Sequence, residues 1–504
     1  MKKQYWSNKW VFILAAIGSA AWLGNLRRFP FQVYDHGGAA FIIAYLLILI
    51  LLWFSLLIWE VAIWQYSWKW APGALWNVSK YFKWAWWAWI FTAVVILSYY
   101  AVVIWWSMDY LWYSIKSLFT WTDLVWANNA KDFFFSNVLH ISSWIDKLWS
   151  ISMPVLIWTI ITWILIYFFT FKSVKSVWKV ILVTATLPFI TLAILAIRWA
   201  TLPGASEGLA YLLNIDWSYL TKIDTWIAAA WQIFFTLSLA MWIMIAYWAL
   251  KKQDSEIVQS TILVAIGNTI VSFLSAIAVF GTLWYLAAQK WIPVDKVVAG
   301  GPSLVFVTIP ETIHLLPALQ SLFAVIFFIT VFLLAIDSAM SLVEAVWVAI
   351  RDRFKNLRVE ILTLIIVIFL ALTSLAYVFS NGLYVLDIVD HFITSYSMLF
   401  IWVMEAILFL FIRKKLWNFI DERNSCLLKV VINKYFLLIW WIISALILGF
   451  LLYQNISWWI KYDNYDNWYL ILYWVYTLVG IYVVSILLNI LDILVKNKKE
   501  NTEN

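Results

Sequence analysis

Glycine, cysteine and charged residues are scarce in this chain of 504 residues. Only 12% of the residues are charged, about half the share found in soluble globular domains, which excludes a soluble protein and a disordered one. The single cysteine, Cys426, excludes a disulfide framework and any cysteine-rich metal site. The four histidines (His36, His140, His314 and His391) form no metal-binding motif, and no nucleophile–base pair is recognisable, so an enzyme is not expected.

Long apolar runs dominate the sequence, because 65% of its residues are hydrophobic. Runs of close to 20 apolar residues predict transmembrane helices, so we expect an all-α integral membrane protein with a single domain over residues 1–504. Twelve helices are predicted, at 11–33, 41–66, 88–115, 152–171, 177–197, 226–250, 257–289, 319–350, 360–379, 385–412, 435–453 and 467–495. A short helix is also predicted near 309–316, because Pro310, Glu311 and Thr312 are typical of a helix start.

The distribution of lysine and arginine predicts the orientation in the membrane. With the N-terminus inside, most of the 34 basic residues fall on the inner side, as the positive-inside rule requires. Both termini are therefore expected in the cytoplasm, in the plasma (inner) membrane, and no cleaved signal peptide is expected. This bias accounts for the net charge of +7 without any nucleic-acid partner.

Tryptophan is abnormally abundant where glycine is rare, with 40 tryptophans and 14 glycines. Glycine is usually about 7% of a protein, and membrane helices carry more of it than soluble ones. We hypothesise that many of these tryptophans are glycines, encoded by UGA codons that the source organism reads as glycine. The alternative is a true excess of interfacial aromatic residues, but Trp53, Trp105, Trp158, Trp231 and Trp242 lie inside apolar runs. The sequence alone does not identify which tryptophans are genuine.

The first predicted helix contains polar and small residues halfway across the membrane, in the stretch 18–30. Gly18, Gly24, Asn25 and Pro30 favour an unwound segment. Freed carbonyl groups in such a segment can bind a cation, and freed amide groups can bind an anion. The alternative is a seam of small residues at which two helices pack.

A second interruption is predicted in the helix at 226–250, where Gln232, Thr236 and Ser238 are polar at mid-span. Paired interruptions in corresponding helices indicate an inverted-repeat transporter. We expect a five-plus-five arrangement, with repeats at about 11–200 and 225–412. The helices at about 435–453 and 467–495 would then be additional.

Several separate motifs follow one another in a fixed order. They are 12–20, Gly24-Asn25, Arg28-Phe29-Pro30, 37–41, Tyr99-Tyr100, 232–238 and Asp337-Ser338. Over about residues 6–412 this order resembles the neurotransmitter:sodium symporter family, which includes a bacterial leucine transporter with broken helices. The family pattern has glycine where this sequence has Trp22, Trp53, Trp64, Trp105, Trp231 and Trp242.

The resemblance implies two sodium sites made of oxygen ligands, as a hard cation prefers. One would use the Ala20 carbonyl, the side chains of Asn25, Thr236 and Asn268, and the carboxylate of the substrate. The other would use the carbonyls of Gly18, Ala21 and Leu334 with the side chains of Asp337 and Ser338. An alternative for Asp337 is a carboxylate paired with a neighbouring helix.

The resemblance also implies a substrate pocket and its ligand class. The pocket would be lined by Ala20, Trp22, Leu23, Gly24, Ile96, Tyr100, Phe235, Thr236, Ser238, Met241, Ser338 and Leu342. Monoamine carriers of the family have aspartate at position 22, and no acid is present here, so an amino acid is favoured over an amine. The apolar lining predicts a hydrophobic or aromatic side chain, and an indole at position 22 would fill the pocket.

Chloride dependence is expected from one position of the helix at 257–289. Chloride-independent bacterial relatives carry an acid four residues after the asparagine that corresponds to Asn268, where this sequence has Ser272. Tyr45, Gln232, Thr236 and Ser272 would then surround a bound Cl⁻ that offsets the sodium charge. In the alternative, Ser272 only packs between helices.

Two pairs of charged residues are expected to act as gates. Arg28 and Asp390 would close the outer side above Tyr100 and Phe235, and Lys3 with Asp352 would close the inner side. Either pair could instead be a solvated surface ion pair, which contributes little.

The sequence thus predicts a sodium-coupled symporter that imports an amino acid by alternating access and sits among membrane lipids. A carrier of the same fold driven by protons or by exchange, and a substrate sensor that does not transport, remain alternatives. The identity of the amino acid, the ion stoichiometry and the oligomeric state, including a homodimer, are left open.

Overall fold

The computed structural model describes residues 9–50, 83–146, 151–171, 180, 183–237, 257–351, 358–404, 406–407, 434–459, 469, 472 and 475–490. Within these ranges the chain is nearly all helical and forms no strand, only two isolated bridges. Six described helices are long and apolar enough to cross a membrane, or up to eight spans if each of two bent helix pairs counts as one. The protein is therefore an all-α, multi-pass membrane protein, as the sequence predicts.

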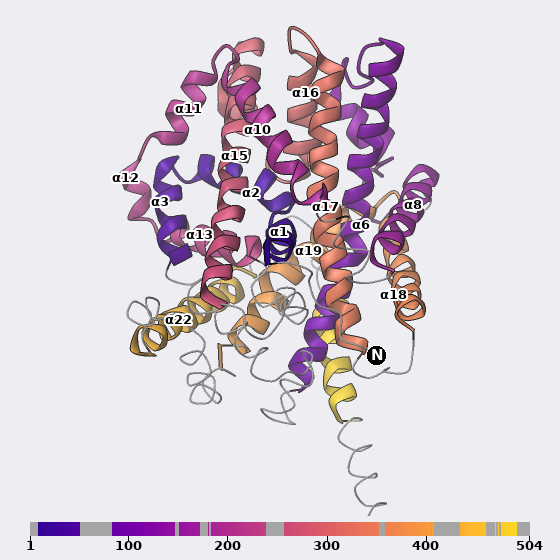
Figure 1. The fold of residues 1–504 in the computed structure, drawn as a ribbon, viewed down its shortest axis with the longest axis vertical. Coiled ribbons are helices and arrows are strands. Elements are labelled where there is room, and N and C mark those ends of the chain that lie inside the picture. The colour runs from indigo at the N-terminus through magenta and orange to yellow at the C-terminus, as the bar shows by residue number, and fades with distance from the viewer. Residues whose placement is uncertain are drawn as a thin grey trace, which may run out of the picture.

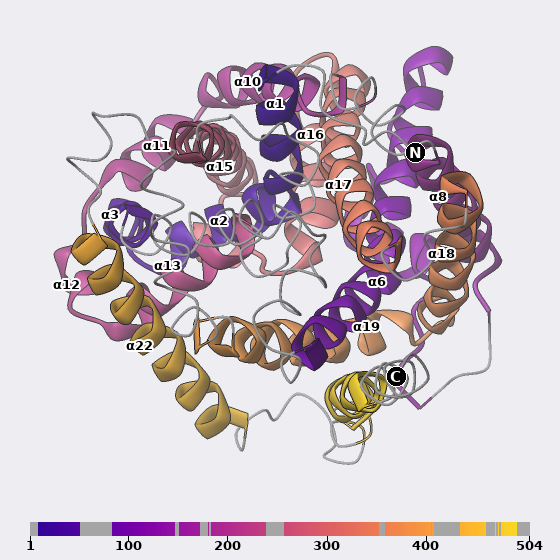
Figure 2. The same ribbon diagram turned by 60° about the horizontal axis from the view of Figure 1, so that its bottom comes forward.

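The six long apolar helices match the predicted ranges closely. They are α6 (Lys83–Thr120), α8 (Met153–Thr170), α15 (Ile257–Lys290), α17 (Gln320–Arg351), α18 (Val359–Ser374, extended by a 3₁₀ turn, Leu375–Tyr377) and α19 (Gly382–Phe392, extended by the π-helical turn η7, Ile393–Ser397). Helices α8 and α18 pack side by side at one edge of the bundle, against α6 (Figures 1 and 2).

The first span is broken, as predicted. It consists of α1 (Lys9–Ala20) and α2 (Leu23–Asp35), which meet at an angle of 55° with two residues between them. Both halves contact α15 and α17, and α2 lies near the middle of the bundle in Figure 2. The predicted single helix at 11–33 is therefore two helices, because Ala21 and Trp22 leave the helical conformation.

A second bent pair was not expected from the sequence. Helix α10 (Leu187–Ala200) is followed by α11 (Ala205–Leu213) at an angle of 112°. Gly204 between them has φ +83°, and a β-carbon there would lie 3.3 Å from that of Ala288 on α15. Glycine suits this turn because the left-handed region and the close approach both disfavour a side chain.

Further helices and helical turns lie between and after these spans along the chain. They are α3 (Ala39–Ile48), α7 (Ala130–Asp132), η3 (Phe133–Val138), α12 (Trp217–Leu220), α13 (Ile223–Thr236), η4 (Val294–Lys296), α22 (Lys434–Trp459) and η8 (Val475–Val479). The later parts of the helices predicted at 41–66, 226–250 and 385–412, a few residues at the start of 177–197 and parts of 467–495 lie outside the described residues.

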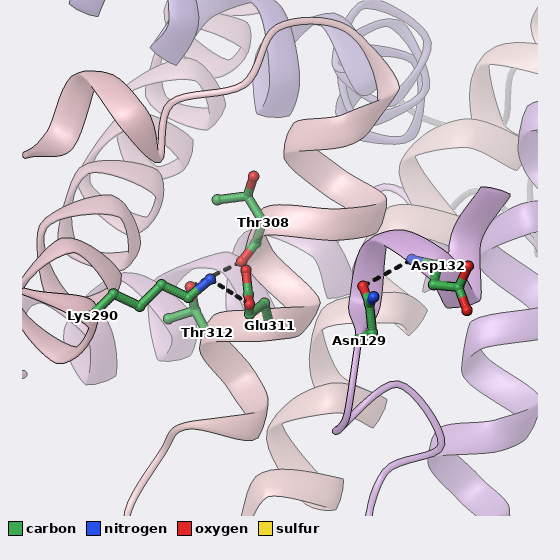
Figure 3. Close-up of polar contacts among 6 residues, drawn as sticks. All are labelled: Asn129, Asp132, Lys290, Thr308, Glu311 and Thr312. Carbon is green, nitrogen blue, oxygen red and sulfur yellow. Dashed lines mark hydrogen bonds and ion pairs between the residues drawn. The ribbon is translucent and has the colours of Figure 1, made fainter. Parts of the chain in front are cut away.

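The predicted short helix near 309–316 is present as α16 (Ile309–His314), preceded by the π-helical turn η5 (Leu304–Thr308). The two segments are continuous, and we call them together the η5–α16 helix. The Tyr285 hydroxyl donates to the Leu315 carbonyl at 2.6 Å, and Lys290 forms an ion pair with Glu311 (Figure 3). These contacts connect the η5–α16 helix to α15.

On its other side the η5–α16 helix is attached to α6 and to the loop after α6. The Trp126 indole N–H donates to the Pro310 carbonyl at 3.1 Å, and the Tyr110 hydroxyl donates to the Phe306 carbonyl at 2.6 Å. The short helix α7, whose Asp132 amide is capped by the Asn129 side chain at 3.0 Å, packs against η5 (Figure 3). The η5–α16 helix is thus fixed between α15 on one side and α6 on the other.

Candidate functional site

A cavity of about 130 Å³ lies beside the break in the first span. It is bounded by α2, α6, α17 and α19, by the end of α13, and by the η5 residues Val305 and Phe306. The predicted pocket residues that line it are Trp22, Leu23, Gly24, Ile96, Tyr100, Phe235, Ser338 and Leu342. Ala20 and Thr236 are fully buried without lining it. Ser238 and Met241 lie outside the described residues.

The break itself is stabilised by one side chain. Asn25 in the first turn of α2 accepts a hydrogen bond from the Trp22 amide at 3.1 Å, and the Asn25 amide donates to the Trp22 carbonyl at 3.0 Å. Helix α1 ends as the Ala21 amide donates to the Ile17 carbonyl at 2.7 Å. The amides of Leu23 and Gly24 lie in the first turn of α2, where amide groups have no partner within the helix and favour an anion.

Four buried polar side chains meet behind the break. Asn25 Nδ2 donates to Asn268 Oδ1 at 2.8 Å and to Ser272 Oγ at 2.9 Å. Asn268 Nδ2 donates to Thr236 Oγ1 at 2.9 Å. All four side chains are fully buried. This cluster brings together the predicted ligands Asn25, Thr236 and Asn268 from α2, α13 and α15, and its amide and hydroxyl oxygens suit a hard cation.

A second polar group forms where α17 meets the end of α1. Asp337 is buried, its Oδ1 accepts from Thr184 Oγ1 at 3.1 Å, and its Oδ2 has no hydrogen-bond partner. The carboxylate presses against Gly18, where a β-carbon would overlap it. A buried, unpaired carboxylate oxygen is costly unless a cation compensates it, so this geometry fits a bound cation.

Ser338 connects the same two helices. Its hydroxyl lies 3.4 Å from the Ser19 carbonyl and 3.2 Å from the Leu334 carbonyl. The predicted ligands Gly18, Leu334, Asp337 and Ser338 are therefore grouped at the contact between α1 and α17. Within the described ranges, no group of three or more His, Cys, Asp or Glu side chains could hold a metal.

The residues predicted to surround an anion come from three elements. The Tyr45 hydroxyl on α3 lies 3.5 Å from Thr269 Oγ1 on α15, one turn before Ser272. Gln232 on α13 is fully buried, and neither its amide oxygen nor its amide nitrogen has a hydrogen-bond partner. A buried amide donor without a partner is unfavourable, and a bound anion would satisfy it.

The outer pair of charged residues lines the cavity without direct contact. The Arg28 guanidinium lies 4.9 Å from the centre of the Phe235 ring. Asp390 instead accepts a hydrogen bond from the Tyr99 hydroxyl at 2.6 Å. No ion pair links Arg28 to Asp390 among the residues that the structure describes. Lys3 and Asp352, predicted as the inner pair, lie outside them.

Several cavity and site residues are not among those predicted from the sequence. Arg27 lines the cavity beside Arg28, and its position next to a candidate gate residue was the available signal. Val305 and Phe306 line the cavity from η5, which is distant in sequence from the other predicted pocket residues. Thr184 contacts Asp337 across the bundle, and no local pattern indicates that contact.

Comparison with known proteins identifies what this arrangement is similar to. The sequence model of the sodium:neurotransmitter symporter family matches residues 3–130 and 124–495. An uncharacterized sodium-dependent transporter of Methanocaldococcus jannaschii is 33% identical over 465 residues, which is 91% of each chain.

Two animal proteins are also similar to the chain. A sodium- and chloride-dependent GABA transporter of Drosophila melanogaster is 32% identical over 429 residues, or 79% of this chain. A sodium-dependent dopamine transporter of Bos taurus is 32% identical over 433 residues, or 80% of this chain. The matches span 45% and 62% of these two longer proteins.

Proposed function

The chain belongs to the sodium:neurotransmitter symporter family, and we propose that it imports an amino acid with a hydrophobic or aromatic side chain, together with Na⁺. It is a transporter of a sodium-dependent family and not an enzyme. Transport would proceed by alternating access, in which one part of the bundle rocks against the rest around a central site. We also propose that the protein lies in the plasma membrane with both termini in the cytoplasm.

The substrate class is supported chiefly by the charge of the cavity. Among its described lining residues, Asp390 is the one carboxylate, and it is bonded to Tyr99, while Arg27 and Arg28 are cationic. A substrate with its own carboxylate fits this lining better than a simple amine. Its carboxylate would bind the first amides of α2 and the Tyr100 hydroxyl, which is buried without a hydrogen-bond partner.

The apolar lining would contact the substrate side chain. Ile96, Phe235 and Leu342 border the cavity with Met398. Of the remaining predicted contacts, Ser238 and Met241 would complete the site from the chain after α13. An aliphatic or aromatic side chain would be favoured there by burial of apolar surface.

Two Na⁺ ions would travel with the substrate. The first would bind the Ala20 carbonyl and the cluster of Asn25, Thr236 and Asn268, next to the substrate carboxylate. Sharing one coordination shell couples the two affinities, because each partner then stabilises the binding of the other. This is how the sodium gradient would drive uptake.

The second Na⁺ would bind at Asp337 and Ser338 with the carbonyls of Gly18, Ala21 and Leu334. The unpartnered Asp337 Oδ2 supports this assignment. A cation there would stabilise the contact between α1 and α17, and its release would free α1 to move.

A chloride ion would neutralise part of the sodium charge. Tyr45, Gln232, Thr236 and Ser272 offer hydroxyl and amide donors without a carboxylate, and the unpartnered Gln232 amide supports an anion at this place. The relative named as a sodium- and chloride-dependent GABA transporter is consistent with this proposal.

Closure would occur on the two sides in turn. Arg28 and Asp390 would pair when the outer side closes, since both already line the cavity. Lys3 and Asp352 would pair on the inner side. The absence of a direct Arg28–Asp390 contact among the described residues suits a structure in which the outer side is not closed.

The decisive experiment is uptake of radiolabelled L-leucine and L-phenylalanine into proteoliposomes. We expect uptake that requires an inward Na⁺ gradient, falls when gluconate replaces Cl⁻, and disappears in the Asp337→Asn variant. Uptake driven equally well by a pH gradient or by preloaded amino acid without Na⁺ would contradict sodium coupling. Binding without uptake would indicate a sensor.

A further inference from the structure

Two long helices end on a tryptophan in the left-handed backbone conformation. Trp121 follows α6 with φ 55°, and Trp291 follows α15 with φ 56°. A bulky residue with positive φ is a true outlier. The position just after a helix is, by contrast, where glycine commonly adopts this conformation.

The hydrogen bonds at the end of α15 define the position further. The Trp291 amide donates to the Ala288 carbonyl at 3.4 Å, and the Ile292 amide donates to the Ala287 carbonyl at 3.2 Å. This pair of bonds is the Schellman motif, which requires a left-handed residue at the position that Trp291 occupies. The backbone itself therefore calls for glycine.

Neither indole compensates for this conformation by packing. Trp121 is 90% exposed and Trp291 is 93% exposed. Exposed tryptophans at helix ends are also typical of membrane interfaces, but an interface gives no reason for positive φ. Two other non-glycine residues in the described ranges have positive φ: His140, a residue type that tolerates it, and Leu319, which precedes α17.

Trp22 differs because it is mostly buried and lies in the cavity. Its ring centre is 6.0 Å from that of Phe235 and 6.4 Å from that of Tyr100. Its indole covers Gly24, where a β-carbon would lie 2.6 Å from the ring. The indole N–H and the Tyr100 hydroxyl are both buried without a hydrogen-bond partner.

Other buried tryptophans show what a well-accommodated indole looks like in this fold. Trp126 donates to the Pro310 carbonyl at 3.1 Å, and Trp163 donates to Ser374 Oγ at 3.0 Å. Both side chains are almost fully buried. Their polar atoms are satisfied, as is usual for a buried tryptophan.

We infer that residues 22, 121 and 291 are glycines in the protein made by its source organism, whereas Trp126 and Trp163 are tryptophans. Glycine at position 22 then determines the size of the substrate: the cavity extends over Gly24 between Phe235 and Tyr100 and accepts an amino acid with a large side chain. This last step rests on the proposed function, but the residue assignments do not.

Peptide mass spectrometry of the protein isolated from its source tests the assignments directly. We expect the mass of glycine at positions 22, 121 and 291 and that of tryptophan at 126 and 163. Tryptophan at 121 or 291 would overturn the argument from backbone conformation. Tryptophan at position 22 would overturn the inference that the cavity extends over Gly24.

Variants of the chain made with tryptophan test the physical argument separately. We expect Trp291→Gly and Trp121→Gly to raise the melting temperature of the purified protein, and the control Trp126→Gly to lower it. A fall in melting temperature for Trp291→Gly would contradict the inference.

Binding of radiolabelled L-phenylalanine in Na⁺ tests the size of the cavity. We expect Trp22→Gly to bind at least about tenfold more tightly than the chain with Trp22, and Trp22→Ala to show a smaller gain. Equal affinities would overturn the role of position 22 and leave the transport proposal intact. No binding of leucine or phenylalanine by any variant, with glycine found at position 22 by mass, would instead contradict the proposed substrate.

Discussion

Asn25 on α2 donates through its side-chain amide to the side-chain oxygen of Asn268 on α15, at a distance of 2.8 Å. The same Asn25 side chain accepts from the Trp22 amide at the break. One residue thus connects the unwound segment of the first span with a continuous helix that is distant in sequence. The break cannot change its shape without affecting the Asn268 and Thr236 side chains behind it.

Replacing Asn268 is expected to weaken sodium binding. Asn268→Ala removes an oxygen ligand and one of the two side-chain hydrogen bonds that Asn25 Nδ2 donates, so the half-saturating Na⁺ concentration should rise at least about tenfold, which corresponds to roughly 1.4 kcal/mol. The measurement is Na⁺-dependent uptake of L-phenylalanine. Ser275→Ala is the matched control on α15, since Ser275 is equally buried and its hydroxyl has no partner. An unchanged Na⁺ dependence in Asn268→Ala would exclude this residue from the site.

Ser272 is expected to decide whether chloride is needed. In Ser272→Glu a fixed carboxylate would supply the negative charge, so uptake should become independent of Cl⁻ while still requiring Na⁺. Ser272→Ala should keep the chloride requirement and weaken chloride affinity. Uptake is measured with Cl⁻ or gluconate on both sides of the membrane. A Ser272→Glu protein that still needs Cl⁻ would place the anion elsewhere.

Thr184 is expected to act through Asp337. Thr184→Val removes the hydrogen bond to Asp337 Oδ1 and should raise the half-saturating Na⁺ concentration about fivefold, because such a bond to a charged group contributes on the order of 1 kcal/mol or more. Thr191→Val is the control, since Thr191 is also a buried threonine but accepts its hydrogen bond from Thr330, away from Asp337. A lower melting temperature with unchanged Na⁺ affinity in Thr184→Val would reduce Thr184 to a packing role.

The two contacts that hold the η5–α16 helix, the Lys290–Glu311 ion pair and the Trp126–Pro310 hydrogen bond, should differ in strength. Lys290 and Glu311 are partly exposed, so Lys290→Met should change the free energy of unfolding by less than about 1 kcal/mol. Trp126→Phe keeps the aromatic packing against Tyr110 but leaves the buried Pro310 carbonyl without its donor, which should cost about 1–3 kcal/mol. Thermal unfolding in detergent compares the two variants. A larger loss of stability in Lys290→Met than in Trp126→Phe would show that the exposed ion pair holds the η5–α16 helix.

Local sequence patterns were sufficient for the break and for most helix positions. Small and polar residues at 18–25 predicted the break that the structure places at Ala21 and Trp22. The apolar run at 319–350 appears as α17 (Gln320–Arg351), and the helix start at Pro310 appears as α16. These features depend on residues close together in the chain, which is why the sequence reveals them.

Contacts across the bundle were less accessible to sequence reasoning. Nothing near Thr184 indicates that its hydroxyl meets Asp337, because the pairing depends on how α17 packs. The π-helical turn at Ile393–Ser397 has no distinctive local pattern, whereas the turn into α11 is marked by Pro203-Gly204. The resemblance to a known family supplied most of the site residues, and composition alone led to the hypothesis that some tryptophans are glycines without identifying which ones.

Gly18 and Asp337 fit together so closely that the acid occupies the volume of the missing β-carbon. The two positions therefore cannot diverge independently, since any side chain at the first would displace the acid at the second. A chimera that receives its first span from a related carrier would need a matching residue at 337. Joint randomisation of this pair is a direct way to find combinations that a new ion could use.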